Sequence, residues 1–444
     1  MKIAVIGTGH VGLITCVTLA VLGHDVVGHD ADEEKLISLE RGVAPFYEPG
    51  LEELLIRSLA TGRLRFSNDV ATALREAQVA FICVGTPPRS SGEANLIAVE
   101  RAASQVSRYA SDGVVVVEKS TVPAGTAERV RRTLRLELGG NGPALEVVSN
   151  PEFLREGRAI EDSMRPDRIL IGADSPRAFS TMREVYAPLI ERGHLLIETD
   201  IATAELAKHA CNAFLALKIS YANALARLCE QSGADVVAVA DIMGSDPRIG
   251  RAFLNAGLGY GGYCFPKDLA AFERLAARSG YSFPLLREVE RINGEAVEAT
   301  LEKIQDALWN LEGKSVGLLG LSFKPDTDDV RFSPALTLAR KLVGEGADVT
   351  GYDPQASSAA KSEVPELHVC TDAYEVAAGA HCLVICTDWD EFMDLDLGRL
   401  RDVMRYPVVV DARNLFEPTA MRRLGFAYYP TGRPAVPLGL EVLT

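Results

Sequence analysis

A glycine-rich turn follows directly on the first apolar run of the chain. Residues 2–6 predict a β-strand, and Gly7, Gly9 and Gly12 form the pattern G-x-G-x-x-G between that strand and a helical apolar pattern. A second strand pattern follows at residues 25–28. Because parallel strands need a crossover connection, this order predicts a β-α-β unit at the start of a parallel sheet.

Further strand patterns extend the unit into a larger sheet. They occupy residues 79–84, 114–118, 147–149 and 169–172 and are separated by helix-length stretches. From about residue 203 the apolar period changes to three and four residues, and two long helices are predicted over residues 204–231 and 285–311. Helices of this length suit a connector that also forms a dimer interface.

The strand, turn, helix and strand order is repeated after Gly313. Its parts are residues 314–319, 334–344 and 348–352, with later strands at 381–386 and 407–410. This half lacks a complete G-x-G-x-x-G, so its loop is expected to hold a nucleotide by other means. With 444 residues, two or three domains are expected. The sequence predicts an α/β fold with two Rossmann-like, doubly wound parallel-sheet domains, residues 1–200 and 313–444, joined by a long-helix central region, residues 201–312.

Composition excludes some classes of partner. The net charge of -15 argues against nucleic acid or an anionic membrane surface, because both favour clustered Lys and Arg. The chain starts in a strand pattern rather than a signal peptide, and no segment offers about 20 uninterrupted apolar residues. The eight cysteines include no C-x-x-C, which indicates reduced thiols. We expect a cytoplasmic protein without a metal site.

The first glycine turn suits a dinucleotide. Gly7 permits the turn, Gly9 lets a pyrophosphate approach the backbone, and Gly12 lets helix and strand lie close together. Asp30, at the end of the second strand, can accept hydrogen bonds from both ribose hydroxyls and would repel a 2′-phosphate, so NAD is favoured over NADP. Lys35, taken alone, is better interpreted as a solvated helix residue.

Three loops follow predicted strand ends, where open parallel sheets bind their ligands. Two of them end in a hydroxyl residue and a proline, at Thr86 and Thr121, and either line a cofactor or are proline-stopped strands with a capping threonine. The third carries Glu152 and Glu156, which share a face if the segment is helical. They either position water and accept protons or are solvated acids at a helix start.

A lysine and an asparagine lie four residues apart on the first long helix. Lys208 and Asn212 are flanked by apolar residues, and a partly desolvated lysine suits the stabilisation of a developing oxyanion. His209 falls on a different face of the helix and is interpreted as structural.

One cysteine has unusual surroundings. Four glycines lie at residues 257–262, directly before Cys264, and Pro266 with later apolar spacing begins a helix there. A helix N-terminus and the nearby Lys267 both favour the nucleophilic thiolate over a buried inert thiol.

Two polar segments follow strand patterns of the last domain. Residues 323–331 and 411–414 carry cations where a diphosphate or sugar would bind, although an exposed acidic turn is a fair alternative.

Ten motifs resemble those of one known family and occur in its order. They are GTGHVG, FYEPGL, VGTP, KSTVPAGT, SNPEFLREG, PDRILIG, AELAKHACNAF, GYGGYCFPKD, FKPDTDDVR and DARN. Over nearly its whole length the chain is similar to the UDP-glucose dehydrogenase family, within the wider UDP-glucose/GDP-mannose dehydrogenase superfamily. His10 replaces a common tyrosine and Asn95 a common aspartate, and neither departure touches the expected chemistry.

The resemblance implies a four-electron oxidation of UDP-glucose to UDP-glucuronate by two NAD and water, through a thiohemiacetal and a thioester on the cysteine. The implied catalytic residues are Thr121, Glu152, Lys208, Asn212, Cys264 and Asp268. The expected NAD contacts are Gly7, Gly9, Val11, Gly12, Asp30, Lys35, Thr86, Thr121, Glu156, Lys267 and Arg331. The expected UDP-sugar contacts are Glu152, Phe153, Leu154, Arg155, Glu156, Lys208, Asn212, Arg248, Phe253, Leu254, Asn255, Ala256, Gly257, Gly261, Lys324 and Arg413. Arg248 resembles an arginine that reaches into a neighbouring subunit, which implies a homodimer through the central helices.

Alternatives to this substrate remain. GDP-mannose and UDP-N-acetylhexosamines undergo the same chemistry in related branches. An inactive nucleotide-binding scaffold is a third hypothesis, although it needs none of Cys264, Lys208, Glu152 and Asp268. A one-step β-hydroxyacid dehydrogenase would explain the first domain and the long helix, but it would not need the cysteine loop.

Overall fold

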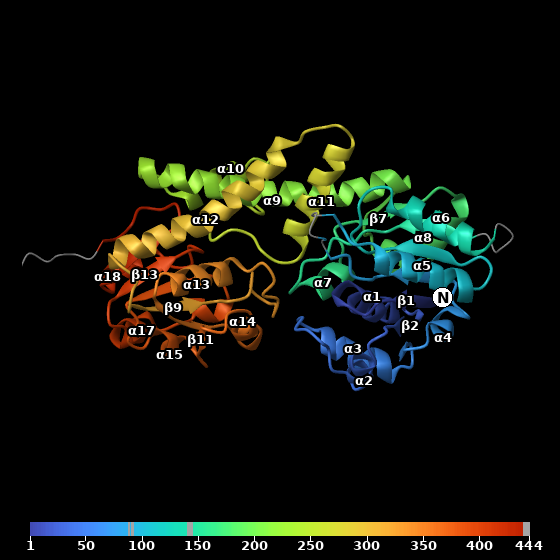
Figure 1. The fold of residues 1–444 in the computed structure, drawn as a ribbon, viewed down its shortest axis with the longest axis horizontal. Coiled ribbons are helices and arrows are strands. Elements are labelled where there is room, and N and C mark those ends of the chain that lie inside the picture. The colour runs from blue at the N-terminus through green and yellow to red at the C-terminus, as the bar shows by residue number, and fades with distance from the viewer. Residues whose placement is uncertain (88, 90–92, 140–144, 438–444) are drawn as a thin grey trace, which may run out of the picture. The chain divides into compact units, whose positions relative to one another are not determined.

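The chain folds into two compact units. The computed structural model describes residues 1–87, 89, 93–139 and 145–437 (Figure 1). The N-terminal unit comprises Met1–Cys211 and Lys267–Tyr281, and the C-terminal unit comprises Asn212–Pro266 with Ser282–Thr444. Each unit is considered by itself below.

Within the described residues, the N-terminal unit contains an eight-stranded sheet of order β3-β2-β1-β4-β5-β6-β7-β8. Its strands are β1 (Lys2–Ile6), β2 (Asp25–His29), β3 (Leu64–Ser67), β4 (Val79–Ile82), β5 (Val115–Glu118), β6 (Glu146–Ser149), β7 (Ile169–Gly172) and β8 (Leu196–Thr199). Its sheet-flanking helices are α1 (His10–Val21), α2 (Glu33–Glu40), α3 (Leu51–Ala60), α4 (Val70–Leu74), α5 (Ile97–Tyr109), α6 (Thr126–Glu137), α7 (Ala159–Met164) and α8 (Pro176–Ile190).

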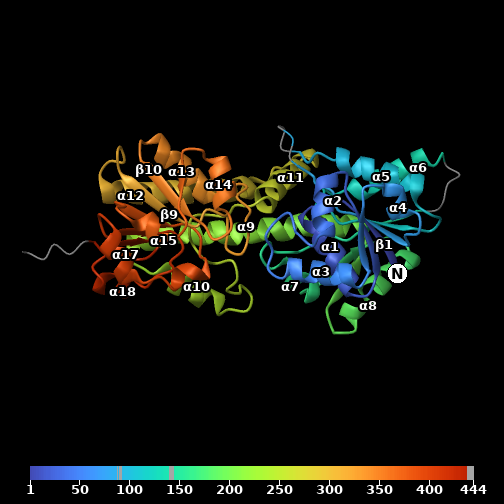
Figure 2. The same ribbon diagram turned by 90° about the horizontal axis from the view of Figure 1, so that it is seen from below.

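Both faces of this sheet are buried at its centre. On β1, Ile3 and Val5 enter a core with apolar residues of α1, α3 and α8, while Ala4 and Ile6 enter a second core with α5 and α6. Strands covered on both faces are continuously apolar, as the predicted runs were. Figure 2 allows β1, α1, α2 and α3 to be followed from the N-terminus.

One strand pair departs from the parallel sheet that the sequence predicts. Among the described strands of this unit, β6 and β7 pair antiparallel at Ser149 and Gly172, whereas the other pairs are parallel. The intervening loop and the short α7 return the chain without a full crossover, which the apolar runs alone do not reveal.

The described part of the C-terminal unit contains a six-stranded parallel sheet of order β11-β10-β9-β12-β13-β14. Its strands are β9 (Ser315–Leu319), β10 (Asp348–Tyr352), β11 (His368–Val369), β12 (Cys382–Ile385), β13 (Val408–Asp411) and β14 (Ala427–Pro430). Its sheet-flanking helices are α13 (Pro334–Gly344), α14 (Ser357–Glu363), α15 (Ala373–Ala377), α16 (Asp390–Met393), α17 (Leu397–Val403) and α18 (Pro418–Arg423). This strand order repeats that of β3-β2-β1-β4-β5-β6, so two Rossmann-like sheets are confirmed.

The central part of the chain is helical, as predicted. Its helices are α9 (Ile201–Ser232), α10 (Val236–Gly244), α11 (Cys264–Arg278) and α12 (Pro284–Leu308). The 32 residues of α9 supply side chains to both units, because the division falls after Cys211. None of the described helices is long and apolar enough to cross a membrane. The eight cysteines all lie among the described residues and are free thiols.

Candidate active site

The glycine turn of the N-terminal unit has the geometry that a dinucleotide needs. Gly7 has a φ of +94°, which favours glycine, and a Cβ on Gly12 would lie 1.9 Å from the Gly7 carbonyl oxygen. A Cβ on Gly9 would meet nothing within 4 Å, and no described side chain caps the N-terminus of α1, which begins at His10. Open space beside helix amides fits a pyrophosphate. Val11 lies in the first turn of α1.

Asp30 is held in place by its neighbours. Its Oδ2 atom accepts hydrogen bonds from the Thr8 backbone N–H and hydroxyl and lies 2.8 Å from Nζ of Lys35. Burial alone would raise the pKa of the Asp30 carboxyl, but Lys35, Thr8 and Asp32 lower it to about 2. The carboxylate is therefore ionised, as ribose binding requires. Lys35 is paired with Asp30 rather than simply solvated.

The two loops with threonine and proline contact each other. The Thr86 hydroxyl donates to the Thr121 carbonyl oxygen at 2.9 Å, and Nζ of Lys267 lies 3.5 Å from the same oxygen. Nζ of Lys267 also lies 2.9 Å from Oδ1 of Asp268, and both side chains are buried. Burial alone would raise the pKa of the Asp268 carboxyl, but Lys267 and Lys208 lower it. Two predicted site residues, Thr86 and Lys267, thus contact the Thr121 carbonyl oxygen, and Asp268 pairs with Lys267.

Lys208 and Glu152 form a buried ion pair. Their Nζ and Oε1 atoms are 3.0 Å apart, and Oε2 of Glu152 accepts a hydrogen bond from the Leu154 N–H. Burial opposes ionisation of Glu152, but Lys208 and the Leu154 N–H lower the pKa of its carboxyl overall. The Phe153 ring lies close to two cations, with Nζ of Lys208 5.2 Å and the Arg168 guanidinium carbon 3.8 Å from its centroid.

Glu152 and Glu156 are not on one face of a helix. Residues 151–155 have no regular structure and Glu156 begins a turn, with Gly157 at a φ of +78°. The buried Glu48 carboxylate accepts the backbone N–H groups of Gly157 and Ala159, which holds this segment as a loop. Arg155 instead pairs with Asp162.

The cysteine loop belongs to the C-terminal unit. Cys264 is the first residue of α11 and is half-buried. The Gly262 N–H donates to the Arg331 carbonyl oxygen at 3.0 Å, and a Cβ on Gly262 would lie 2.7 Å from the Phe323 ring. The Arg331 guanidinium carbon lies 4.6 Å from the centroid of the Tyr263 ring. The cysteine loop is therefore fixed on the segment after β9 that carries Lys324 and Arg331.

A second set of predicted residues meets in the same unit. The Gly257 N–H donates to Oδ1 of Asn223 at 2.7 Å, and a Cβ on Gly257 would lie 2.5 Å from the Ala412 carbonyl oxygen and 3.4 Å from Arg413. Nε of Arg413 donates to the Cys386 carbonyl oxygen. The stretch that holds Gly257 thus lies against the strand end that carries Arg413.

The remaining predicted substrate contacts have the following places. Phe253 has a φ of 65°, and its ring centroid lies 6.3 Å from that of Phe265. Leu254 and Ala256 are buried, and Asn255 accepts a hydrogen bond from Arg251. Asn212 is buried on α9. The Arg248 side chain is 87% exposed and pairs with Asp246, two residues away.

In the described part of the C-terminal sheet, the aspartate at the position of Asp30 has a different environment. Asp353 follows β10 as Asp30 follows β2, but it is buried and accepts hydrogen bonds from Leu321, Ser322 and Trp389. A carboxylate saturated in this way supports the fold and is not available to a ribose.

Sequence reasoning missed several residues that hold the site loops. They are Thr8, Glu48, Glu205 and Asn150. His209 was interpreted as structural, but the sequence did not indicate its hydrogen-bond partner. Asn150 accepts hydrogen bonds from Lys119 and Tyr186, and Glu205 accepts them from the Gly125 and Ala127 N–H groups at the start of α6. Buried polar residues in FYEPGL and AELAKHA were the available signal. In the described part of the chain, no group of His, Cys, Asp or Glu could hold a metal ion.

Three family models cover most of the chain. All describe the UDP-glucose/GDP-mannose dehydrogenase family: its NAD binding domain matches residues 1–190, its central domain 202–295 and its UDP binding domain 317–418.

Similar proteins match over the full length. The UDP-glucose 6-dehydrogenase of Rhizobium meliloti (strain 1021) is 45% identical over 98% of this chain and 100% of its own. The structure of a UDP-glucose dehydrogenase from Pyrobaculum islandicum has a TM-score of 0.89 at 39% identity, covering 97% of this chain and 98% of that one. A UDP-D-ManNAc dehydrogenase from Pyrococcus horikoshii has a TM-score of 0.85 at 30% identity, covering 98% and 99%.

Proposed function

The chain belongs to the UDP-glucose/GDP-mannose dehydrogenase family, and we propose that it oxidises UDP-glucose to UDP-glucuronate through a thioester on Cys264. The observation that carries the proposal is a half-buried thiol as the first residue of a 15-residue helix, behind a glycine loop held by the segment of residues 323–331. A helix N-terminus favours the thiolate, which is the form that attacks an aldehyde.

The reaction balances as a four-electron oxidation. One primary alcohol, two NAD⁺ and one water give one carboxylate, two NADH and three protons. NAD⁺, when bound, accepts the hydride in each oxidation. The glycine turn and Asp30 would hold its pyrophosphate and ribose, and Thr86, Thr121, Glu156, Lys267 and Arg331 would complete the set of cofactor residues.

Lys208, Asn212 and Cys264 act in the first oxidation and in the addition of the thiol. C6 of the sugar loses a hydride and its hydroxyl a proton, and Lys208 and Asn212 stabilise the oxygen bound to C6. The Cys264 thiolate adds to the resulting aldehyde and forms a carbon–sulfur bond. The oxygen of the thiohemiacetal is stabilised by the same two residues.

The second half of the reaction ends in hydrolysis. Loss of a second hydride from C6 turns the thiohemiacetal into a thioester. Water then attacks the thioester carbon, the carbon–sulfur bond breaks, and the thiolate is regenerated. Thr121, Glu152 and Asp268 organise this water and accept its protons. The lowered pKa of the Glu152 carboxyl keeps it ionised, so it can accept a hydrogen bond from the water.

UDP-glucose is the favoured substrate among the nucleotide sugars of the family. The relative from R. meliloti, which is 45% identical, is named for UDP-glucose, whereas the neighbour named for UDP-D-ManNAc is 30% identical. The UDP-sugar contacts proposed in the C-terminal unit are residues 253–257, Gly261, Lys324 and Arg413. Residues 152–156, Lys208, Asn212 and Arg248 complete the set.

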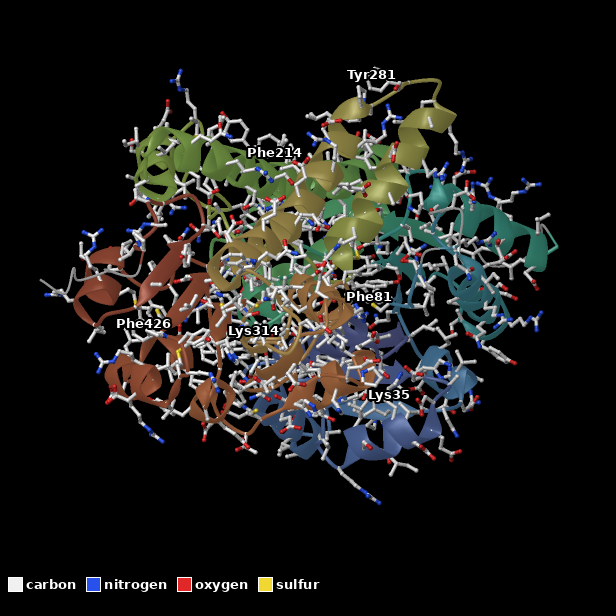
Figure 3. All side chains as sticks on the ribbon, turned by 60° about the vertical axis from the view of Figure 1, so that its left-hand side comes forward. Lys35, Phe81, Phe214, Tyr281, Lys314 and Phe426 are labelled. Carbon is white, nitrogen blue, oxygen red and sulfur yellow. The ribbon has the colours of Figure 1, made fainter. Side chains whose placement is uncertain are left out.

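We also propose that the domains comprise residues 1–200, 201–312 and 313–444. The protein would form a homodimer in the cytoplasm. Phe214, labelled in Figure 3, Tyr221 and Leu228 are spaced by seven residues on α9 and are 61%, 49% and 60% exposed. An apolar stripe of this period suits a second helix. Arg248, with its exposed side chain, would reach the partner subunit. Eight free thiols suit a reducing compartment.

The decisive experiment counts NADH per sugar. Purified protein is incubated with NAD and UDP-glucose, GDP-mannose or UDP-N-acetylglucosamine, and two NADH per UDP-glucose consumed are expected. One NADH per sugar would remove the thioester, and none with any sugar would favour a binding scaffold. Cys264→Ser should abolish steady-state formation of the acid, whereas the control Cys370→Ser, at another half-buried thiol, should keep it. Undiminished turnover of Cys264→Ser would overturn the assignment of the nucleophile.

A further inference from the structure

The segment between β5 and α6 carries Thr121 and is held from helix α9. Nε2 of His209 lies 2.8 Å from the Val122 carbonyl oxygen. One turn earlier on α9, the Glu205 carboxylate accepts the Gly125 N–H at 2.5 Å and the Ala127 N–H at 2.8 Å. Side chains four residues apart lie on the same face of a helix, so one face of α9 contacts both ends of the stretch of residues 122–127.

Thr121, which directly precedes this stretch, is also held. Its carbonyl oxygen accepts the Thr86 hydroxyl, and Nζ of Lys267 lies 3.5 Å away. Two consecutive carbonyl oxygens, those of Thr121 and Val122, therefore have side-chain partners from three different parts of the N-terminal unit.

His209 acts here as a neutral donor. Because the Val122 carbonyl only accepts, Nε2 must carry the hydrogen. Burial, together with the Lys267 and Lys208 cations, lowers the pKa of the imidazole, although the Asp268 carboxylate opposes this. Nδ1 is buried and has no hydrogen-bond partner among the described residues, so the ring has a single protein hydrogen bond and it goes to the Thr121 segment.

Glu205 holds the start of α6. Gly125 is the N-cap residue of α6, has a φ of +88° and has no side chain of its own to cap the helix. The buried Glu205 carboxyl group takes the place of such a cap. Burial raises the pKa of this carboxyl, and the backbone N–H groups of Ala127 and Gly125 oppose the rise because they favour the ionised form. The position of the helix start, and with it the preceding loop, is thereby tied to α9.

We propose that Glu205 and His209 are positioning residues of the oxidation, which set the place of Thr121 without touching the substrate. This inference rests on the proposed role of Thr121 in holding water and NAD. A catalytic group displaced by about 1 Å costs roughly a hundredfold in rate, so a loosened segment lowers turnover even when the fold is intact.

The test compares three variants at these two positions. His209→Leu removes the donor, whereas His209→Gln keeps an N–H at a similar reach. Glu205→Gln keeps the shape of the carboxylate but loses its charge, and its NH₂ group faces one of the two backbone N–H donors. Hydrogen exchange of the backbone amides of residues 120–127 is measured in the enzyme without NAD, together with kcat and both KM values.

His209→Leu and Glu205→Gln should exchange these amides at least about tenfold faster and lower kcat by roughly ten- to a hundredfold, with KM for UDP-glucose within about twofold. His209→Gln should recover most of the loss. The control, Ser220→Ala, removes another buried side-chain bond of α9, the one to the Val289 carbonyl oxygen, and should leave exchange in residues 120–127 and kcat unchanged.

Two outcomes overturn the inference. Wild-type exchange of residues 120–127 in His209→Leu shows that the segment is held without His209. An equal loss of kcat in His209→Leu, His209→Gln and Ser220→Ala assigns the effect to general stability. The hydrogen-exchange arm needs no turnover, so it decides the inference even if the wild-type enzyme does not oxidise UDP-glucose.

Discussion

Nζ of Lys208 lies 3.0 Å from Oε1 of Glu152, and the two side chains are 5% and 4% exposed. Lys208 lies on α9 and Glu152 in the loop after β6, so the pair ties these two elements together. Attraction in a buried pair offsets the cost of removing both charges from water, whereas removal of one partner leaves the other charge uncompensated.

We expect Lys208→Met to lower the free energy of unfolding by about 3–5 kcal/mol, because Glu152 is then a buried charge without its cation. The double variant Lys208→Met/Glu152→Gln should recover most of that loss. Denaturant unfolding measures both. Both variants should also lose roughly 10²–10³-fold in kcat, because the donor to the oxygen on C6 is gone. A single variant as stable as the wild type would refute the energetic importance of the pair.

Asp30→Ala should relax the choice of cofactor. The Asp30 carboxylate is ionised, since its pKa is lowered to about 2, and its charge repels a 2′-phosphate. KM for NAD should rise about tenfold, and the ratio of kcat/KM for NADP over NAD should rise by about the same factor. Asp353→Asn in the C-terminal sheet is the contrast, because this buried carboxylate serves the fold. It should lower Tm and leave the NADP to NAD ratio alone.

Gly257→Ala should weaken UDP-sugar binding selectively. An added Cβ would lie 2.5 Å from the Ala412 carbonyl oxygen, so the stretch of residues 253–257 must move away from the strand end that carries Arg413. KM for UDP-glucose should rise about tenfold, while KM for NAD stays within about twofold. Gly294→Ala is the matched control, since α12 offers open space there and alanine favours a helix by about 1 kcal/mol. Equal kinetics in the two variants would contradict the steric argument.

Glu118→Gln should make stability less dependent on pH. Glu118 ends β5, accepts the Ser120 N–H and is buried, and burial raises the pKa of its carboxyl to about 8. Between pH about 4.5 and 8 the unfolded chain loses this proton while the folded chain keeps it, so the wild type loses stability as pH rises.

Glutamine has no proton to lose, so the variant should gain roughly 3–5 kcal/mol over the wild type at pH 8 and little at pH 4.5. Denaturant unfolding at the two pH values measures the difference. Glu100→Gln, at an exposed position of α5, should show no such gain. A pH-independent difference between Glu118→Gln and the wild type would sink the explanation.

Most helices and strands could be predicted from the local pattern of apolar residues and glycines. Strands β1, β7 and β10 and helix α13 have the predicted bounds, because a buried parallel strand is continuously apolar and a glycine marks each turn. The antiparallel pairing of β6 with β7 was not readable, because an apolar run has the same composition in either direction.

The loops around the site were less predictable. Glu152 and Glu156 would share a face if their segment were helical, but Glu48 accepts the N–H groups of Gly157 and Ala159 and keeps the segment a loop. Glu48 and Gly157 are 109 residues apart, and no periodic pattern records such a pairing.

The sequence by itself determined the two Rossmann-like sheets, the long helix α9 and the cysteine at the start of α11, because each depends on residues that are close in the chain. Tertiary structure alone decided the partner of each buried polar group: Lys208 with Glu152, His209 with Val122, and Glu205 with Gly125. A buried polar group must find a hydrogen-bond partner, but which one it finds depends on how distant segments come together.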